Sequence, residues 1–264
     1  MTFDIDTFAA DSTPVRFEDL DMSSFRDDPL PEDSLRCLRY MCDVEYHTVC
    51  YLRDLLVTPS SREGDVAGFM TMWNREEFWH GEALAAVLAA HDITVDYDEL
   101  KARRTKLGWR EALSSLKQSV LANLVGADFV ATHMLWGAAN EWSAVAAYRR
   151  MADLERHPVL AVLLRRIAQQ ETRHVAFYAT RARERLTASE PARRVARLTL
   201  ERFWRPVGTS IMGRTEVRHV MGHLFSEPDG RAEVRRIDQN IARLPGMAGV
   251  TVFDDALEAE GVPA

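Results

Sequence analysis

The chain has 264 residues, of which 47% are hydrophobic and 28% charged, and its formal net charge is -7. Such a composition is typical of a globular protein in water, and the negative balance excludes a broad basic surface for nucleic acid. Its three cysteines form no Cys-x-x-Cys pair, which favours free thiols in a reducing cytoplasm. No uncharged run approaches the roughly 20 residues that cross a bilayer, and the acidic N-terminus lacks the basic flank and apolar core of a signal peptide. We therefore expect a soluble cytoplasmic protein with no membrane span and no nucleic-acid partner.

The first half of the chain predicts an arm followed by long helices. Residues 1–33 are rich in Asp and contain prolines near their end, which predicts an irregular N-terminal arm. Apolar residues then recur at helical spacing over residues 34–57 and 65–90, and the turn-rich "TPSSREGD" separates the two runs. Residues 110–156 contain no proline and predict one long helix or two, with Gly126 or Gly137 as the weak points.

The second half predicts further helices over residues 158–186, 189–206, 214–226 and 229–243. Pro158 suits the first position of a helix because its missing N–H needs no partner there. Only "GVTVF", at residues 249–253, alternates like a strand. The predicted class is all-α, with a helical bundle over residues 34–190. Residues 191–264 are expected to form additional C-terminal helices and a tail that pack on the bundle within a single domain.

Two Glu-x-x-His pairs lie within apolar helical stripes. Glu77 and His80 belong to "REEFWHGEAL", and Glu171 and His174 belong to "QQETRHVAFY". Residues three apart share one face of a helix, so each pair projects a carboxylate and an imidazole to the same side. A single pair of this kind is most often a solvated contact on the surface. Two pairs in apolar stripes argue against that interpretation.

Two further glutamates complete a pattern. Glu45 and Glu141 each lie in an apolar stripe without a histidine, so the chain order is Glu, Glu-x-x-His, Glu, Glu-x-x-His on successive predicted helices. This is the ligand set of di-metal carboxylate sites in four-helix bundles. Buried lone carboxylates cost several kcal/mol each, whereas two divalent cations balance four of them. Oxygen and imidazole ligands without thiolate suit iron or manganese. The predicted metal ligands are Glu45, Glu77, His80, Glu141, Glu171 and His174, and no catalytic residue is indicated beyond them.

Several neighbouring residues are alternatives to this set. Glu76 lies four residues before His80, but Glu77 reproduces the spacing of the second pair, and Asp43 is a weaker rival to Glu45. A lone core histidine is more often a packing residue than a ligand, so we assign packing roles to His47 and His133. A third motif, "RTEVRHVMGH", lacks matched carboxylates on neighbouring helices, which favours a surface or interface role over a metal site; it contains Glu216, His219 and His223.

The ligand segments resemble the ferritin-like di-iron carboxylate superfamily, and most closely its soluble acyl-carrier-protein desaturases. The stretches "REEFWHG" (75–81) and "QETRH" (170–174) match the two histidine-containing elements of those enzymes. The resemblance covers about residues 34–186. It implies a ferritin-like four-helix bundle in which a long crossover joins the second and third helices. It also implies two iron ions, with manganese at one position as an alternative.

Three departures from that family bear on the reaction. Phe78 and Trp79 replace a polar pair, and Gln170 replaces the acid that in the desaturases tunes a ligand histidine. Ala144 and Val145 stand where these enzymes often carry a hydroxyl residue, one turn after the third ligand glutamate.

The resemblance implies an O2-activating di-iron oxidoreductase of fatty acid metabolism. The substrate would be an acyl chain on a carrier protein or CoA, with an external electron donor such as a ferredoxin, and the protein would be a homodimer. Alternatives are a di-iron N-oxygenase or hydroxylase of a small metabolite, and a non-enzymatic or ferroxidase iron-binding protein. Small residues near the ligands, including Gly81 and Gly137, leave room either for a substrate tunnel or for close helix packing. Two basic clusters are candidates for contact with an acidic acyl carrier protein: Lys101, Arg103, Arg104 and Lys106, and Arg193, Arg194 and Arg197.

Overall fold

The computed structural model describes residues 3–96, 98, 122–123 and 125–262. Every regular element in these ranges is a helix, which confirms the all-α class. The basic cluster at residues 101–106 and the first part of the helix predicted over residues 110–156 lie outside the described residues. None of the described helices is both long enough and apolar enough to cross a bilayer.

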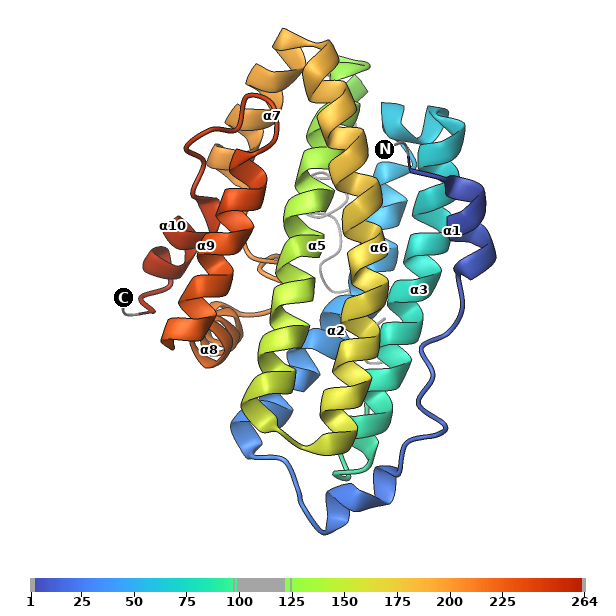
Figure 1. Cartoon of the computed structure of the whole chain (residues 1–264), viewed down its shortest axis with the longest axis vertical. Helices are drawn as coiled ribbons and strands as arrows, with labels where there is room; N and C mark the ends of the chain where they lie inside the picture. Colours follow the sequence, from blue (N-terminus) through green and yellow to red (C-terminus); the bar gives the residue numbers. More distant parts are fainter. Residues whose placement is uncertain (1–2, 97, 99–121, 124, 263–264) are drawn as a thin grey trace.

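Four long helices lie side by side and form the centre of the molecule (Figure 1). They are α2 (Glu32–Leu55), α3 (Gly64–Ala89), α5 (Asp128–Glu155) and α6 (Pro158–Ala188). Helix α2 packs on α3, α5 packs on α6, and α3 also contacts α6. In Figure 1, α3 ends at the bottom of the molecule whereas α5 begins near the top, so the ends of these two consecutive helices lie far apart. The predicted crossover between these helices falls largely on residues 97, 99–121 and 124, which lie outside the described residues, and it stays a prediction.

The turn between α5 and α6 shows how the local sequence ends one helix and starts the next. Arg156 takes a left-handed conformation with φ 51°, which interrupts the helical hydrogen-bond pattern after Glu155. The ring of His157 then accepts a hydrogen bond from the backbone N–H of Leu160, and Pro158 takes the first helical position. This short connection sets α5 and α6 antiparallel, and it places the glutamate of one helix opposite the Glu-x-x-His pair of the other.

The C-terminal helices pack on one side of this centre. Helices α7 (Glu190–Phe203), α8 (Arg214–Phe225) and α9 (Pro228–Ala242) all contact α5, and α10 (Val252–Ala259) contacts α9. The strand-like interpretation of "GVTVF" is wrong, because its last two residues begin α10. The carboxylate of Asp238 accepts hydrogen bonds from the backbone N–H groups of Phe253 and Asp254 and stabilises that helix start.

The N-terminal arm is more ordered than predicted. It contains α1 (Ile5–Asp11) and a 3-10 helix (Met22–Arg26), and a second 3-10 helix (Pro59–Arg62) precedes α3. The side chain of Asp4 accepts hydrogen bonds at the start of α1, and Phe8 and Phe25 are buried. The prediction of an irregular arm was therefore wrong for these segments, since buried aromatic rings and a helix cap were enough to order them. Helix α1 lies against α3, on the opposite side of the molecule from α7–α10 (Figure 1).

Candidate metal centre

The six predicted ligands converge in the interior of the four long helices. Each helix contributes one or two of them: α2 carries Glu45, α3 carries Glu77 and His80, α5 carries Glu141, and α6 carries Glu171 and His174. None is more than 5% exposed. They form two overlapping groups within which the potential ligand atoms all lie within 4.8 Å of one another. One group is Glu45, Glu77, His80 and Glu171; the other is Glu77, Glu141, Glu171 and His174.

Glu77 and Glu171 belong to both groups, so they lie between the two sets of unshared ligands. Each group then has one carboxylate of its own and one histidine of its own. Glutamates shared in this way are placed to bridge two ions, and the unshared residues are placed at the two ends. The arrangement therefore offers two adjacent positions for a metal ion, each with three carboxylates and one imidazole.

Both histidines direct Nδ1 into the cluster. Nδ1 of His80 lies 3.2 Å from Glu171 Oε1, and Nδ1 of His174 lies 2.8 Å from Glu171 Oε2 and 3.1 Å from Glu77 Oε1. Their Nε2 atoms point away from the cluster and bond to residues outside it. With Nε2 held by an outer partner, Nδ1 of each ring faces one of the two positions at which a metal ion could bind.

Four atoms of the cluster are buried without a hydrogen-bond partner among the described residues: Glu45 Oε2, Glu77 Oε1, His80 Nδ1 and Glu171 Oε1. A buried polar atom that makes no hydrogen bond costs about 1–3 kcal/mol, and native proteins keep few of them. Their concentration in one place, on metal-ligating atom types, fits a site built to hold cations.

The electrostatics of the metal-free form reflect crowded buried carboxylates. Burial, together with the charge of Glu171, raises the pKa of Glu77 to about 7 and that of Glu141 to about 8. Burial and the neighbouring Glu77 raise the pKa of Glu45 well above its usual value. Burial alone lowers the pKa of histidine, and it does so for His80. Cations would oppose these shifts for the carboxylates, because positive charge favours their ionised form.

Four side chains bond to the ligands from outside the cluster. The sequence named Glu76 as a rival ligand and Gln170 as a departure from the desaturase pattern, but it assigned no such role to Trp73 or Tyr148. Nε2 of His174 donates to Glu76 Oε2 at 2.8 Å, and Nε2 of His80 donates to Gln170 Oε1 at 2.9 Å. The indole N–H of Trp73 donates to Glu141 at 3.0 Å, and the hydroxyl of Tyr148 donates to Glu45. The spacing of Trp73 and Tyr148 could have identified them. Trp73 lies four residues before Glu77 and Tyr148 lies seven after Glu141, so each shares a helix face with a ligand.

The residues weighed as rival ligands lie outside both groups. Glu76 is fully buried but bonds to the outer side of His174, and Asp43 pairs with Arg39 at 3.0 Å. His47 bonds through Nδ1 to the backbone carbonyl of Asp43, and His133 bonds through Nδ1 to the hydroxyl of Ser60 at 2.8 Å.

The third Glu-x-x-His motif lies on α8 and docks that helix onto the start of α2. Glu216 forms a bidentate pair with Arg36 at 2.7 Å, and His219 bonds to the backbone carbonyl of Asp33 at 3.0 Å. His223 lies 3.9 Å from Glu155. Among the described residues this motif forms no group of three potential ligands as close as those of the main cluster. Its contacts are those of an internal interface between helices.

The two aromatic residues in the first Glu-x-x-His pair do not line the cluster. Phe78 is 40% exposed and packs edge-on against Tyr46, and Trp79 is half-buried beneath the guanidinium of Arg75. Both side chains face outward. Beside His174 the apolar contacts come instead from Phe69, whose ring stacks on that of Phe177 at 3.7 Å.

The small residues near the ligands serve close helix packing. A Cβ added at Gly137 would lie 2.3 Å from the ring of Tyr178, and one at Gly81 would lie 3.0 Å from the ring of Tyr46. At these two positions the space next to the backbone is filled by aromatic rings. Of the two interpretations drawn from the sequence, packing applies here.

Of the two basic clusters, the one within the described residues forms hydrogen bonds and ion pairs with other parts of the same chain. Arg193 donates to the carbonyls of Leu186 and Thr187, Arg194 pairs with Glu190, and Arg197 pairs with Glu201. Exposed pairs of this kind contribute little to stability, yet they reduce the positive charge that the cluster offers to an acidic partner.

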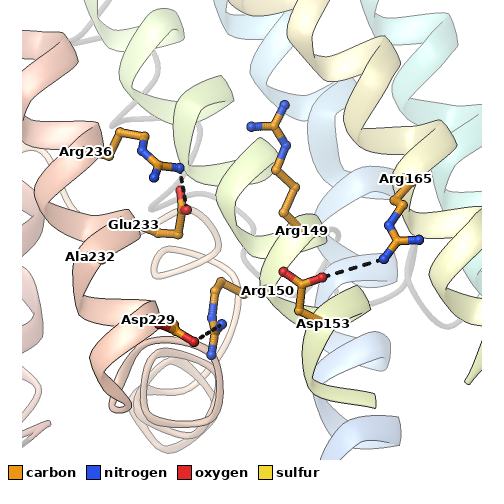
Figure 2. Close-up of a pocket in the computed structure, with 8 residues that line it drawn as sticks. All are labelled: Arg149, Arg150, Asp153, Arg165, Asp229, Ala232, Glu233 and Arg236. Atoms are coloured by element: carbon orange, nitrogen blue, oxygen red, sulfur yellow. Dashed lines mark hydrogen bonds and ion pairs between the residues drawn. The ribbon is translucent and has the colours of Figure 1, made fainter. Parts of the chain in front are cut away.

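A surface pocket of about 460 Å³ lies between α5, α6 and α9, away from the ligand cluster (Figure 2). Three arginine–carboxylate pairs lie in its lining: Arg150–Asp229, Arg165–Asp153 and, within α9, Arg236–Glu233. With Arg149 the lining holds four arginines and three carboxylates, so it carries one more positive than negative charge.

Comparison with known proteins gives no match: no protein-family model, no curated protein and no solved structure aligns significantly with this chain. The functional argument therefore rests on the geometry of the site and on the sequence motifs.

Proposed function

We propose that this protein is a ferritin-like di-iron carboxylate oxidoreductase that activates O2 and oxidises an organic substrate. The observation that carries the proposal is the pair of buried groups, each of three glutamates and one histidine, that share Glu77 and Glu171. The same set would be costly to bury without cations, because like charges repel and each carboxylate loses its hydration.

The donor set fits two divalent ions of the iron or manganese type. Glu45 and His80 would hold one ion, Glu141 and His174 the other, and Glu77 and Glu171 would bridge them. Four carboxylates balance the four positive charges of two such ions, and no thiolate is present among the ligands to favour a softer metal. A reduced pair of iron ions supplies O2 binding and two-electron oxidation when present.

The chain's own residues hold and shield this centre. Phe69, Phe177 and the arm residue Phe8 form an apolar wall beside His174, which keeps bulk water from that side. Trp73 and Tyr148 fix the orientation of Glu141 and Glu45 through single hydrogen bonds. Such outer partners hold ligands in place and limit rearrangement during turnover.

For the substrate we propose an acyl chain on a carrier protein or CoA, with desaturation as the reaction and a small iron–sulfur protein as electron donor. The support is the match of "REEFWHG" and "QETRH" to the desaturase elements. The intramolecular pairing of Arg193, Arg194 and Arg197 weakens one of the two candidate docking surfaces for such a carrier.

Metal content tests the core of the proposal. Protein loaded anaerobically with Fe²⁺ and freed of loosely bound metal should retain two irons per chain, and Glu77→Ala and His174→Ala should retain fewer. Glu216→Ala is the matched control, because it removes a Glu-x-x-His glutamate outside the cluster. Equal iron retention in wild type and both cluster variants would remove the proposed function.

O2 exposure of the iron-loaded protein then separates the reaction classes. An oxidase should consume O2 without accumulating iron oxide, and its chromatographic size should be that of a dimer. Product analysis after supplying reductant and acyl-carrier-protein substrates should show an alkene. Accumulation of ferric oxide in a cage-sized particle would assign the protein to iron storage instead.

A further inference from the structure

The metal centre is built on an approximate two-fold relation between α3 and α6. In each helix the residue directly before the bridging glutamate reaches across to the histidine of the other helix. Glu76 of α3 bonds His174 of α6, and Gln170 of α6 bonds His80 of α3. The two contacts are nearly equal in length, 2.8 Å and 2.9 Å, and both engage Nε2.

The chemistry of these two partners differs although their geometry matches. Glu76 is a carboxylate that is 0% exposed, and its charge is retained because His174 and Arg173 bond to it. Gln170 is a neutral amide whose Nε2 donates to the backbone carbonyl of Thr13 in the arm. A carboxylate that accepts the Nε2 proton raises the electron density of the ring and makes Nδ1 a stronger metal donor, and an amide does so less.

The two unshared glutamates, Glu45 and Glu141, also differ in their strength as metal ligands, again in favour of the His174 side. Glu45, on the His80 side, accepts from the phenolic hydroxyl of Tyr148, whereas Glu141, on the His174 side, accepts from the indole N–H of Trp73. Phenol is the more acidic donor and withdraws more charge from the carboxylate it bonds. Both differences therefore make the His174 side the stronger set of ligands.

We propose that the two metal positions are inequivalent, and that the position formed by Glu141 and His174 binds a divalent ion first and more tightly than the position formed by Glu45 and His80. This inference rests on the proposed metal centre and adds to it a defined order of filling. Arg173 bonds to the second oxygen of Glu76 at 3.0 Å and offsets part of its charge. The offset is incomplete, because Arg173 is 28% exposed and therefore hydrated.

Order of filling is measured with Co²⁺, which needs no reductant and absorbs visible light when bound. Calorimetric titration of the metal-free wild type should resolve two binding steps. Crystals grown with one equivalent of Co²⁺ should show anomalous scattering at the His174 position and much less at the His80 position. Equal occupancy of the two positions at one equivalent, or preference for His80, would overturn the inference.

Isosteric exchanges test the cause. Glu76→Gln should weaken the first binding step about 10–100-fold, which is the usual effect of losing an outer partner of a ligand. Gln170→Glu should strengthen the second step and bring the two steps together. The double exchange Glu76→Gln/Gln170→Glu should move the first ion to His80; retention of the wild-type order would show that these two residues do not set it.

Control variants change charge on the same helices without reaching a ligand. Gln169→Glu adds a carboxylate at an exposed position next to Gln170, and Glu82→Gln removes one from an exposed position of α3. Both should leave the two binding steps as in wild type.

The outcomes separate the two proposals: if Co²⁺ does not bind the cluster at all, the metal centre itself is refuted. If two ions bind with equal strength, only the order of filling is refuted.

Discussion

The ring of Phe8, in the N-terminal arm, lies 6.1 Å from the imidazole of His174 in an edge-on arrangement. The arm is thereby in direct contact with the proposed metal centre. Two more contacts lie close by: Arg173 donates to the backbone carbonyl of Asp11 at 2.9 Å, and Gln170 donates to that of Thr13 at 2.8 Å. A segment remote in sequence thus contacts Gln170, the outer partner of His80, and Arg173, which bonds to the outer partner of His174.

Phe8→Ala should loosen the arm and leave the four long helices folded. Phe8 is 3% exposed and packs on Phe69 as well as His174, so its truncation should cost about 3–5 kcal/mol of arm docking. Hydrogen exchange should speed up at backbone amides in residues 3–21 and stay slow in α5 and α6. Phe203→Ala is the control, because Phe203 is 65% exposed. Unchanged exchange in the arm would contradict the packing role of Phe8.

Glu141→Gln should make the metal-free protein more stable and the metal-loaded protein less so. Burial raises the pKa of Glu141 to about 8, so its ionisation is unfavourable in the folded state without cations. A neutral amide removes that cost, and the free energy of unfolding should rise on the order of 1–3 kcal/mol near pH 8. Denaturant unfolding with and without Co²⁺ measures both effects. A less stable metal-free variant would show that the buried carboxyl group of Glu141 carries no such cost in the folded state.

The stabilisation by metal should increase with pH. The carboxyl groups of Glu77 and Glu141 have pKa values raised to about 7 and about 8, above their unfolded value of about 4.3. The folded state therefore holds protons that the unfolded state has released. The stability that these groups contribute is present below about pH 4.3 and is lost as pH rises through about 7 and 8. Metal must displace the same protons, so the rise in melting temperature with Co²⁺ should be larger at pH 8 than at pH 6.

Calorimetry in two buffers with different ionisation enthalpies should show proton release on metal binding at pH 6.5, and less release at pH 8.5. A metal-induced rise in melting temperature that does not change between pH 6 and pH 8 would show that these carboxyl groups are already ionised in the metal-free protein.

Gly137→Ala should destabilise the pairing of α5 and α6. The new Cβ would lie 2.3 Å from the ring of Tyr178, which is itself fully buried and has little room to move. Overpacking of this kind typically costs about 1–3 kcal/mol. Gly222→Ala on α8 is the control, because an added Cβ there meets no atom within 4 Å. Thermal unfolding compares the melting temperatures of the two variants. Equal values would show that the ring of Tyr178 can move aside for the added Cβ.

Tyr178→Phe should have little effect on stability. The hydroxyl of Tyr178 is buried without a hydrogen-bond partner among the described residues, so removing it takes away a desolvation cost and no bond. The free energy of unfolding should stay within about 0.5 kcal/mol of wild type or increase. A marked loss of stability would mean that this hydroxyl has a partner in solution. Reduced O2 consumption with unchanged stability would identify a role in the reaction.

Periodicity and motif order were enough to predict the helical class and the placement of the ligand residues on separate helices. The boundaries of α3 and α6 agree with the predicted ranges within two residues, because their apolar stripes are long and their ends carry proline, serine or glycine signals. The arm and α10 were predicted wrongly. Both are short, and their order depends on contacts with distant parts of the chain, such as Phe8 with Phe69 and Asp238 with Phe253.

The amino-acid sequence by itself determined which side chains are available to hold metal. Glu-x-x-His spacing fixes two residues on one helix face, and that relation does not depend on the rest of the fold. The spacing favoured Glu77 over Glu76 as a ligand, but only the tertiary structure shows that Glu77 lies in both ligand groups while Glu76 bonds the outer side of His174. Glu76 and Glu77 differ by about 100° around the helix axis, so only the position of α6 determines their separate roles. The same holds for Phe78 and Trp79, which face outward because the neighbouring helices lie on the other side of α3.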